Sequence, residues 1–209
     1  MRLFTYWLQT LATVVVVVVA ASPPPPSQPQ PPPPSQPDPP SSPPPAFLMG
    51  KPCPEVELAQ NFNASAFSGS WYKFGGLPNE QEITNNCTVY DYKYTGSGYE
   101  VTESGLNEAG EKQTQRNTFK QITAGVADFV TRVEGLEAHL QVLTTDYSSM
   151  ACLYTCHTVR ETHRVQLAWI LSRTKDLDRK KIAECQVLLK DVNVPLRHLE
   201  KISHGDECL

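Results

Sequence analysis

The chain of 209 residues carries a formal net charge of -4 and contains no run of basic residues. Proteins that bind nucleic acids usually present a basic patch or stripe, so we expect no nucleic-acid partner. Hydrophobic residues make up 40% of the sequence, which is enough for one folded domain with a core of its own.

Residues 1–21 show the three parts of a secretory signal peptide. Arg2 supplies the positive charge, six consecutive valines supply the apolar centre, and Ala20 and Ala21 supply the small residues of a cleavage site. The alternative is a retained membrane anchor, but threonine and glutamine interrupt the stretch before it reaches the roughly 20 apolar residues of a membrane span. We therefore predict cleavage, an extracellular location and no stable membrane insertion of the mature chain.

Residues 22–46 consist almost only of proline, serine and glutamine. Because proline has a fixed φ and no backbone donor, we predict an extended polyproline II spacer without helix or sheet. A ligand for an SH3-like domain is the alternative interpretation, which an extracellular location disfavours. Residues 47–209 then form a single folded domain.

The first part of this domain reads as strands, because short segments alternate between apolar and polar residues and are separated by turn residues. Many short strands at regular spacing are typical of a sandwich or a barrel. Eight strands are predicted, at residues 71–74, 88–94, 99–103, 117–122, 128–133, 140–144, 150–158 and 163–171.

The tail of the domain changes to the period of a helix. Asp178 can cap the first turn, and Pro195 ends the segment. Between them one apolar stripe recurs at helical spacing, at Ile182, Cys185, Leu189 and Val192. A single helix cannot bury this stripe alone, so we expect it to pack on the outside of the sheet.

Three motifs carry a resemblance to a known family. Gly69-x-Trp71 opens the first strand, Thr145-Asp146-Tyr147 precedes the seventh, and the eighth strand is followed by Arg173. In this order and spacing they resemble the signature motifs of the lipocalins, and the resemblance spans residues 53–208. Within that family the chain looks most similar to apolipoprotein D and the insect bilin-binding proteins, through Cys53-Pro54, Asn86-Cys87-Thr88-Val89 and Leu153-Tyr154-Thr155-Cys156.

The resemblance implies an all-β fold, an eight-stranded antiparallel up-and-down β-barrel with the C-terminal helix packed outside. In lipocalins the tryptophan of the first motif plugs the closed end of the barrel and the arginine lies over its ring. Trp71 and Arg173 are therefore expected to have a structural role, and a cation over an indole contributes about 0.5–2 kcal/mol. Thr145, Asp146 and Tyr147 are expected to form the turn that enters strand seven, at the same closed end.

Six cysteines lie beyond the proline-rich spacer, and their even number behind a signal peptide favours disulfides over thiols. The resemblance implies the bridges Cys53–Cys156 and Cys87–Cys208.

The remaining two cysteines are extra to that pattern. Cys152 has the strand parity of Cys156, so both face outward if Cys156 does. Cys185 lies on the apolar face of the helix that should cover this outer wall, so we predict a third bridge, Cys152–Cys185. Two buried free thiols are the alternative.

Two sequons for N-glycosylation are present. Asn63-Ala64-Ser65 lies just before the barrel and is expected to be used. Asn86-Cys87-Thr88 is the poorer acceptor, because its middle residue is expected to be bridged.

An eight-stranded barrel is just wide enough to hold one small ligand, and inward residues alternate along each strand. Trp169 occupies a family position that lines the pocket, so Val165, Leu167 and Leu171 should point inward with it. Tyr92 matches a pocket tyrosine of the apolipoprotein D type and shares its face with Tyr90 and Tyr94. The other predicted lining residues are Phe129, Val133, Leu140, Val142, Ala151 and Leu153. Such a wall suits a ligand with an apolar body and one polar end.

No enzymatic activity is expected. A nucleophilic Cys156 next to His157 and His163 would have to be an exposed thiolate, but Cys156 is expected in a disulfide and no carboxylate is clearly placed to orient a histidine. The cysteines lack zinc-site spacing and the five histidines are scattered, so no metal and no cofactor is predicted. A bound pigment or lipid would be the ligand itself.

The sequence thus predicts a secreted carrier of a small hydrophobic molecule, such as a tetrapyrrole, retinoid, fatty acid or steroid. The alternative is an extracellular interaction module on a proline-rich stalk, with a barrel filled by its own side chains. A cell-surface receptor and weak self-association are the further partners to consider.

Overall fold

The computed structural model describes residues 48–79, 82–133, 136–159 and 163–208. The predicted signal peptide and the proline-rich spacer lie outside these ranges. The described elements are strands β1 to β10, helices α1 (Ala64–Phe67) and α2 (Arg179–Asp191), and two 3-10 turns at Leu196–His198 and Asp206–Cys208.

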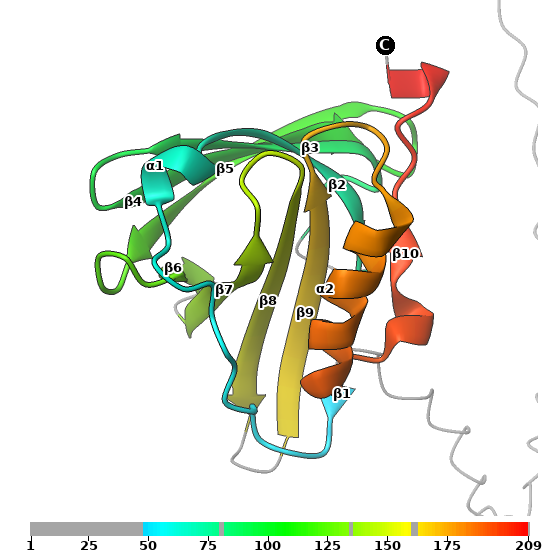
Figure 1. Ribbon diagram of the computed structural model, residues 1–209. Coiled ribbons are helices and arrows are strands. Elements are labelled where there is room, and N and C mark those ends of the chain that lie inside the picture. Colours follow the sequence, from blue (N-terminus) through cyan, green and yellow to red (C-terminus); the bar gives the residue numbers. More distant parts are fainter. Residues whose placement is uncertain (1–47, 80–81, 134–135, 160–162, 209) are drawn as a thin grey trace, which may run out of the picture. The chain divides into compact units, whose positions relative to one another are not determined.

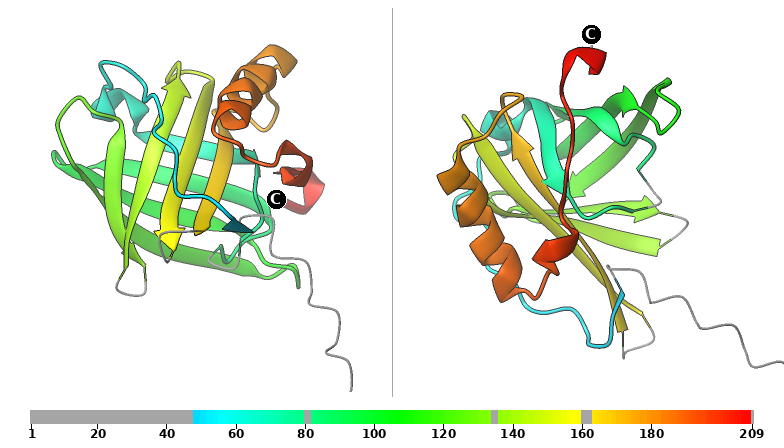
Figure 2. Two further views of the ribbon diagram at one scale, coloured as in Figure 1. Left: turned by 90° about the horizontal axis from the view of Figure 1, so that it is seen from below. Right: turned by 90° about the vertical axis from the view of Figure 1, so that its right-hand side faces the viewer.

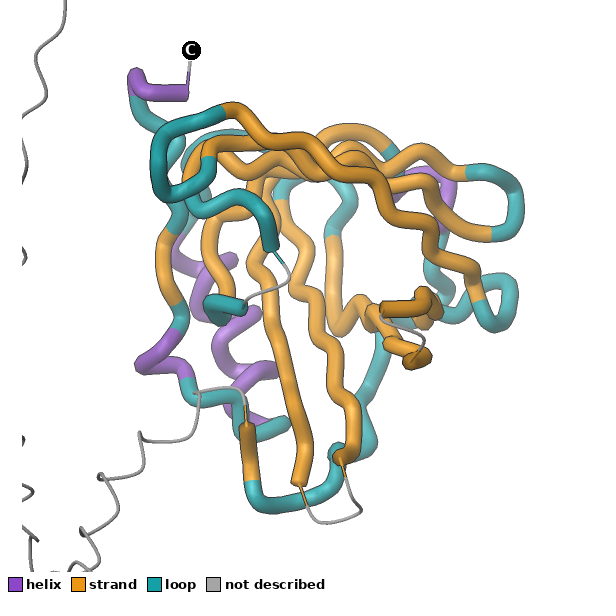
Figure 3. Tube along the Cα trace, turned by 180° about the vertical axis from the view of Figure 1, so that it is seen from behind, coloured by secondary structure: helices purple, strands orange, loops and turns teal. Residues whose placement is uncertain are grey.

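Strands β2 to β9 form a closed antiparallel barrel (Figure 1). Each strand is hydrogen-bonded to the next in the sequence, and β9 also pairs back with β2, where Tyr72 lies opposite Ser172 and Gly76 opposite Trp169. Figure 3 shows the strands, in orange, arranged around the ring. The predicted eight-stranded up-and-down barrel is therefore confirmed. Its strands are β2 (Gly69–Gly76), β3 (Asn86–Tyr94), β4 (Gly98–Leu106), β5 (Lys112–Gln121), β6 (Asp128–Val133), β7 (Leu136–Thr145), β8 (Met150–Val159) and β9 (His163–Ser172).

Strand β5 begins at Lys112, well before the predicted start at residue 117. The segment from Lys112 to Arg116 is polar at every position, so no alternation marks it as a strand. It is a strand because it continues the ladder with β4, from Gly98 opposite Lys120 to Leu106 opposite Lys112. Cross-strand pairing here overrides a weak local preference.

Two short strands extend the barrel at its seam. β1 (Leu48–Met49) pairs with the first part of β9, and β10 (Glu200–Lys201) pairs with the last part of β2. Both cover lengths of strand edge whose backbone groups would otherwise lack a neighbouring strand.

Helix α2 packs on the outside of the barrel, as predicted, and both views of Figure 2 show it beside the strands. Asp178 caps it by accepting a hydrogen bond from the amide of Lys180 at 2.8 Å. Cys185 and Leu189 are fully buried against the outer side chains of β8 and β9, such as Tyr154 and Ile170. These contacts form a second apolar layer, separate from the barrel interior. Among the described helices, none combines the length and the apolar character that crossing a membrane requires.

Three disulfides tie the outer segments to the barrel, in the pairs that the sequence predicted. Cys53–Cys156 attaches the leading segment to β8, Cys87–Cys208 attaches the C-terminal segment to β3, and Cys152–Cys185 attaches α2 to β8. The first two span sequence separations of 103 and 121 residues. Loops of that length give about 4–5 kcal/mol of stabilisation each in the chain-entropy model.

Trp71 and Arg173 seal one end of the barrel. Trp71 is 0% exposed, and its indole nitrogen donates to the carbonyl of Phe67 at 2.9 Å. The guanidinium carbon of Arg173 lies 3.7 Å from the centroid of the indole ring. The same guanidinium donates to the carbonyls of Ser68 and Ser70, both at 2.9 Å. The expected stack between the two motifs is therefore present.

The glycine of the first motif is required by this arrangement. Gly69 has a φ of +95°, which a residue with a side chain rarely adopts. A Cβ atom at this position would also lie only 3.3 Å from Nη1 of Arg173.

The motif Thr145-Asp146-Tyr147 forms the turn between β7 and β8 at the same end. The Asp146 carboxylate accepts hydrogen bonds from the amides of Ser149 and Met150, at 2.8 and 2.9 Å, and from the Ser149 hydroxyl. It also forms an ion pair of 3.1 Å with Lys181 of α2, which ties this turn to the outer helix.

Candidate functional site

A cavity of about 390 Å³ lies inside the barrel, beyond the sealed end. This volume falls within the range of about 300–1,000 Å³ that is typical of small-molecule sites. The lining residues are Asn79, Glu82, Tyr90, Tyr92, Val101, Glu103, Gln115, Asn117, Phe119, Thr131, Arg132, Ala138, His139, Leu140, Leu153, Thr155, Leu167, Trp169 and Leu171.

The buried cluster at the closed end of the barrel forms the floor of the cavity. Tyr92, Val101, Leu153 and Leu171 line the cavity and also belong to the buried cluster around Trp71. The cavity therefore rests on a rigid, close-packed base.

The walls of the cavity differ in polarity. β7, β8 and β9 contribute mainly apolar side chains, among them Leu140, Leu153 and Leu167. The facing strands β4 and β5 contribute the polar side chains Glu103, Gln115 and Asn117, together with Val101 near the floor and Phe119. Because β4 and β8 are four strands apart in an eight-stranded ring, a bound molecule would meet an apolar wall on one side and a polar wall on the other.

Most residues predicted to line the pocket do so. The structure brings Tyr90, Tyr92, Leu140, Leu153, Leu167 and Trp169 together around the cavity, with Leu171. The resemblance identifies the inward face of β3 and β9 through Tyr92 and Trp169, and alternation then predicts their neighbours two residues away.

Phe129, Val142, Ala151 and Val165 were predicted with them but lie elsewhere, Ala151 in the buried cluster at the closed end. Phe129 and Val142 are 1% exposed and belong to the cluster at the closed end, where the Phe129 ring lies 4.9 Å from that of Tyr99. They face inward, yet too close to the sealed end to reach the open volume. Val165 is half-buried where β9 pairs with both β1 and β8. The side chain of Val133 is outside the described part of the chain.

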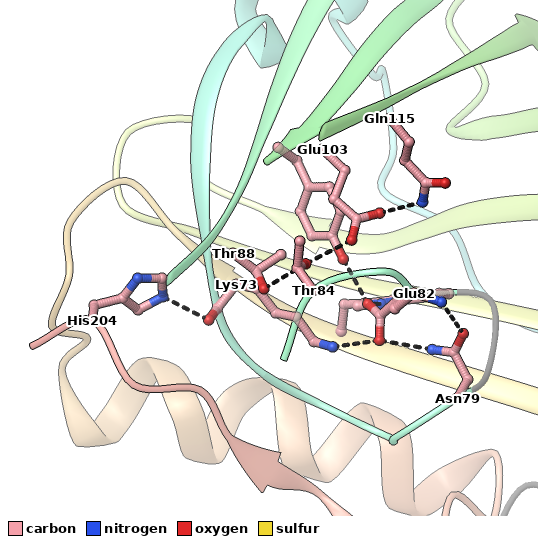
Figure 4. Close-up of polar contacts among 10 residues, drawn as sticks. Lys73, Asn79, Glu82, Thr84, Thr88, Glu103, Gln115 and His204 are labelled. Carbon is pink, nitrogen blue, oxygen red and sulfur yellow. Dashed lines mark hydrogen bonds and ion pairs between the residues drawn. The ribbon is translucent and has the colours of Figure 1, made fainter. Parts of the chain in front are cut away.

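Glu82 reaches from the β2–β3 connection into the cavity and is saturated with donors (Figure 4). Lys73 and Asn79 donate to its Oε2 atom at 2.6 and 2.8 Å. Tyr90 and the indole of Trp169 donate to its Oε1 atom, also at 2.6 and 2.8 Å. The Lys73 and Glu82 side chains are 4% and 10% exposed, so the charge of Glu82 is neutralised inside the protein.

Glu103 lies on β4 and has a different environment. Its residue exposure is 3%, and its two oxygens accept from the Thr84 hydroxyl and the Gln115 amide, each at 2.6 Å. Thr84 uses its one proton for Glu103, so the Thr88 hydroxyl donates to Thr84 across their 2.8 Å contact. Both donors of Glu103 are neutral, and no described cation lies within ion-pair distance of it.

The two carboxylates affect the neighbouring phenols. Burial raises the pKa of Tyr90 well above its ordinary value, and the charges of Glu82 and Glu103 raise it further. Burial, followed by the charge of Glu103, also raises the pKa of Tyr92. Both tyrosines therefore stay protonated, and Tyr90 donates its proton to Glu82.

The sequence analysis missed the polar wall. Tyr99, Val101 and Glu103 follow one another at a spacing of two, so the alternation that places Val101 inside also places Glu103 inside. Glu82 has no such signal, because it belongs to a connection and meets its partners only in the folded chain.

One group of potential metal ligands occurs among the described residues, formed by Cys87, Cys208 and Glu207. Both sulfurs are joined in a disulfide, and a thiolate is the form that binds a metal. All six cysteines are bridged, so none offers a free thiolate.

Comparison with known proteins identifies the family. The model of the lipocalin / cytosolic fatty-acid binding protein family matches residues 68–206. The chain belongs to the lipocalin family. The resemblance drawn from the three motifs is thereby confirmed.

Several lipocalins are similar to the chain. Insecticyanin-A of Manduca sexta is 34% identical over 145 residues, which cover 60% of this chain and 71% of that protein. Apolipoprotein D of Cavia porcellus is 26% identical over 170 residues, with 78% and 86% covered. The solved structure of lobster apocrustacyanin A1 superposes with a TM-score of 0.71 at 25% identity, covering 78% of this chain and 94% of the other. This lipocalin therefore has relatives in both groups that its sequence suggested.

Proposed function

We propose that the protein is a secreted, non-enzymatic carrier that holds one small hydrophobic molecule in its barrel. The observation that carries this proposal is the cavity of about 390 Å³, with an apolar wall above a sealed floor. Tetrapyrroles, retinoids, fatty acids and steroids are the candidate ligand classes. Burial of apolar surface would drive binding, at about 25 cal/mol per Å² before the cost of ordering the ligand. The open volume argues against the alternative of an interaction module with a filled barrel.

Tryptophan fluorescence tests the carrier function, because Trp169 lines the cavity whereas Trp71 is buried at the closed end. A retinoid and a bilin should quench the emission saturably at one ligand per chain, and a fatty acid or steroid that binds should reverse the quenching. The variant Trp169→Phe should lose most of the quenching while its circular dichroism stays that of a barrel. If no member of such a panel gives saturable quenching or competition, the carrier proposal is wrong.

Secretion is supported by the three disulfides, which form and persist in oxidising compartments. Expression of the full chain in animal cells should place the protein in the medium, with an amino terminus close to residue 22. Retention in the cell membrane with residues 1–21 still attached would favour the anchor instead.

Glycosylation at Asn63 is compatible with its place in the fold. Asn63 is exposed and caps α1 through its Oδ1 atom, which accepts from the amide of Ala66 at 3.0 Å and leaves Nδ2 for a sugar. In the second sequon Thr88 is 0% exposed, and Cys87 is bridged. Enzymatic deglycosylation of the secreted protein should therefore remove mass from wild type and Asn86→Gln, but not from Asn63→Gln.

A further inference from the structure

We propose that the ligand carries a protonated amine which pairs with Glu103, while its hydrocarbon body rests on the wall formed by β7, β8 and β9. This inference rests on the proposed carrier function and names the chemical class of its ligand.

The first argument is the charge balance inside the barrel. Glu82 has Lys73 as its counter-ion and three further donors. Glu103 lines the same cavity at 3% exposure with neutral donors alone. A buried carboxylate without a cation is costly, and a cation supplied by the ligand removes that cost.

The second argument is the remaining capacity of Glu103. A carboxylate has about four lone-pair sites, and the two hydrogen bonds from Thr84 and Gln115 use only one on each oxygen. An ammonium group can donate to the free sites while those bonds hold the carboxylate in place. Thr84 and Gln115 therefore orient the Glu103 carboxylate and leave a hydrogen-bond acceptor site free on each of its oxygens.

The third argument is the arrangement of the walls. Glu103 projects from β4, opposite the leucines of β8 and β9, so an amine and an apolar chain on one molecule would each meet a matching surface. The raised pKa of Tyr92 reflects the charge of Glu103 after burial, in keeping with a negative potential on this side.

The basic residues that line the cavity, Arg132 and His139, do not alter this balance. Arg132 also lines the cavity, but it is exposed and lies one residue before the end of β6. His139 is already paired, with Asp128 at 3.0 Å and Glu137 at 3.6 Å. An anionic ligand held by Arg132 is the competing arrangement, and the experiment below separates the two.

The test compares three ligands that share the same alkyl chain and differ in their polar headgroup, namely decylamine, decanol and decanoate. Each displaces the uncharged fluorescent probe N-phenyl-1-naphthylamine from the full-length protein near neutral pH. Decylamine should bind about tenfold more tightly than decanol, since its ammonium adds an ion pair to the hydrogen bond with Glu103 whereas the decanol hydroxyl is neutral. Decanoate should bind most weakly.

The variant Glu103→Gln should abolish the preference for decylamine over decanol. Glu100→Gln is the matched control, because Glu100 lies on the same strand with its side chain 59% exposed and should retain the preference. The comparison of the three ligands in the unchanged protein remains decisive if Glu103→Gln does not fold.

Equal affinity for decylamine, decanol and decanoate, or a preference for decanoate, would overturn the proposal while the carrier function stands. A preference for the amine that persists in Glu103→Gln would overturn the role of Glu103. If neither the probe nor any of the three ligands binds, the carrier function fails and this inference fails with it.

Discussion

Arg173 holds the closed end of the barrel through its shape as well as its charge. Its planar fork reaches several backbone carbonyls while the same plane lies over Trp71. The variant Arg173→Ala should lower the free energy of unfolding by about 2–4 kcal/mol, because it removes the stack and leaves carbonyls without donors. Urea denaturation measures this change.

Two variants make that measurement specific. Arg173→Lys keeps the charge but loses the fork, so its stability should lie between those of wild type and Arg173→Ala. Arg116→Ala, at an exposed position on β5, should change the stability by less than about 0.5 kcal/mol. If Arg173→Ala is as stable as Arg116→Ala, the closed end does not depend on this residue.

Asp146 makes the stability of the turn between β7 and β8 depend on pH. Burial raises its pKa, but the hydrogen bonds from Ser149, Met150 and Lys181 outweigh burial and hold the pKa well below its usual range. The folded pKa thus lies below that of an unfolded aspartate, about 3.9. The stabilisation is complete above about pH 5 and is lost as the pH falls through that value towards the folded pKa.

The variant Asp146→Asn should therefore flatten the pH dependence of unfolding free energy between about pH 5 and pH 2. Denaturation at a series of pH values measures this dependence. Asp176→Asn is the control, since the exposed Asp176 side chain makes none of these hydrogen bonds, and its profile should match wild type. Parallel profiles for wild type and Asp146→Asn would contradict this account.

At this scale the sequence predicts the apolar side of the cavity better than the polar side. The resemblance places Trp169 on the pocket wall and alternation along β9 then finds Leu167, whereas Phe129 has the right orientation but the wrong depth. Depth depends on how the strands stagger around the ring, and alternation carries no information on it. The partners of Glu82 come from three separate elements, so only the folded chain brings them together.

Among the elements, the outer helix α2 is joined to the barrel by a covalent link. The Cys152–Cys185 disulfide joins it to β8 across a separation of 33 residues. Replacing both cysteines by alanine should lower the free energy of unfolding by about 2–4 kcal/mol. It should also speed hydrogen exchange of the α2 amides relative to the strands.

The matched control for α2 is the double variant Cys87→Ala with Cys208→Ala, which removes the disulfide between β3 and the C-terminal segment, and neither of these cysteines belongs to the buried cluster around the helix. Exchange within α2 should then stay slow. Peptide mapping without reduction should find residues 152 and 185 in one linked fragment of the wild type, and free thiols at both positions would refute the bridge.

Helix α2 and strand β5 show why some elements were predicted well and others not. The helix has a cap, an apolar stripe and a terminating proline, three local signals that agree. The first half of β5 has no apolar alternation, because Gln113 and Gln115 occupy inward positions on a polar wall. A polar cavity wall removes the pattern by which a strand is recognised.

For the whole molecule, the barrel should fold without the segments that precede it. The buried clusters and the three disulfides all lie between residues 53 and 208. A chain of residues 47–209 should have the thermal midpoint and ligand affinity of the protein that retains the proline-rich spacer. Calorimetry of both forms tests this, and a lower midpoint for the shorter form would show that the spacer contributes to the fold.

The plug formed by Trp71 and Arg173 also has a kinetic consequence. Because this end of the barrel is closed, a ligand enters and leaves through the same opening. A second ligand therefore cannot displace the bound one by entering from the opposite end. The rate of ligand exchange then equals the dissociation rate of the bound ligand, and a higher concentration of the competing ligand does not increase it.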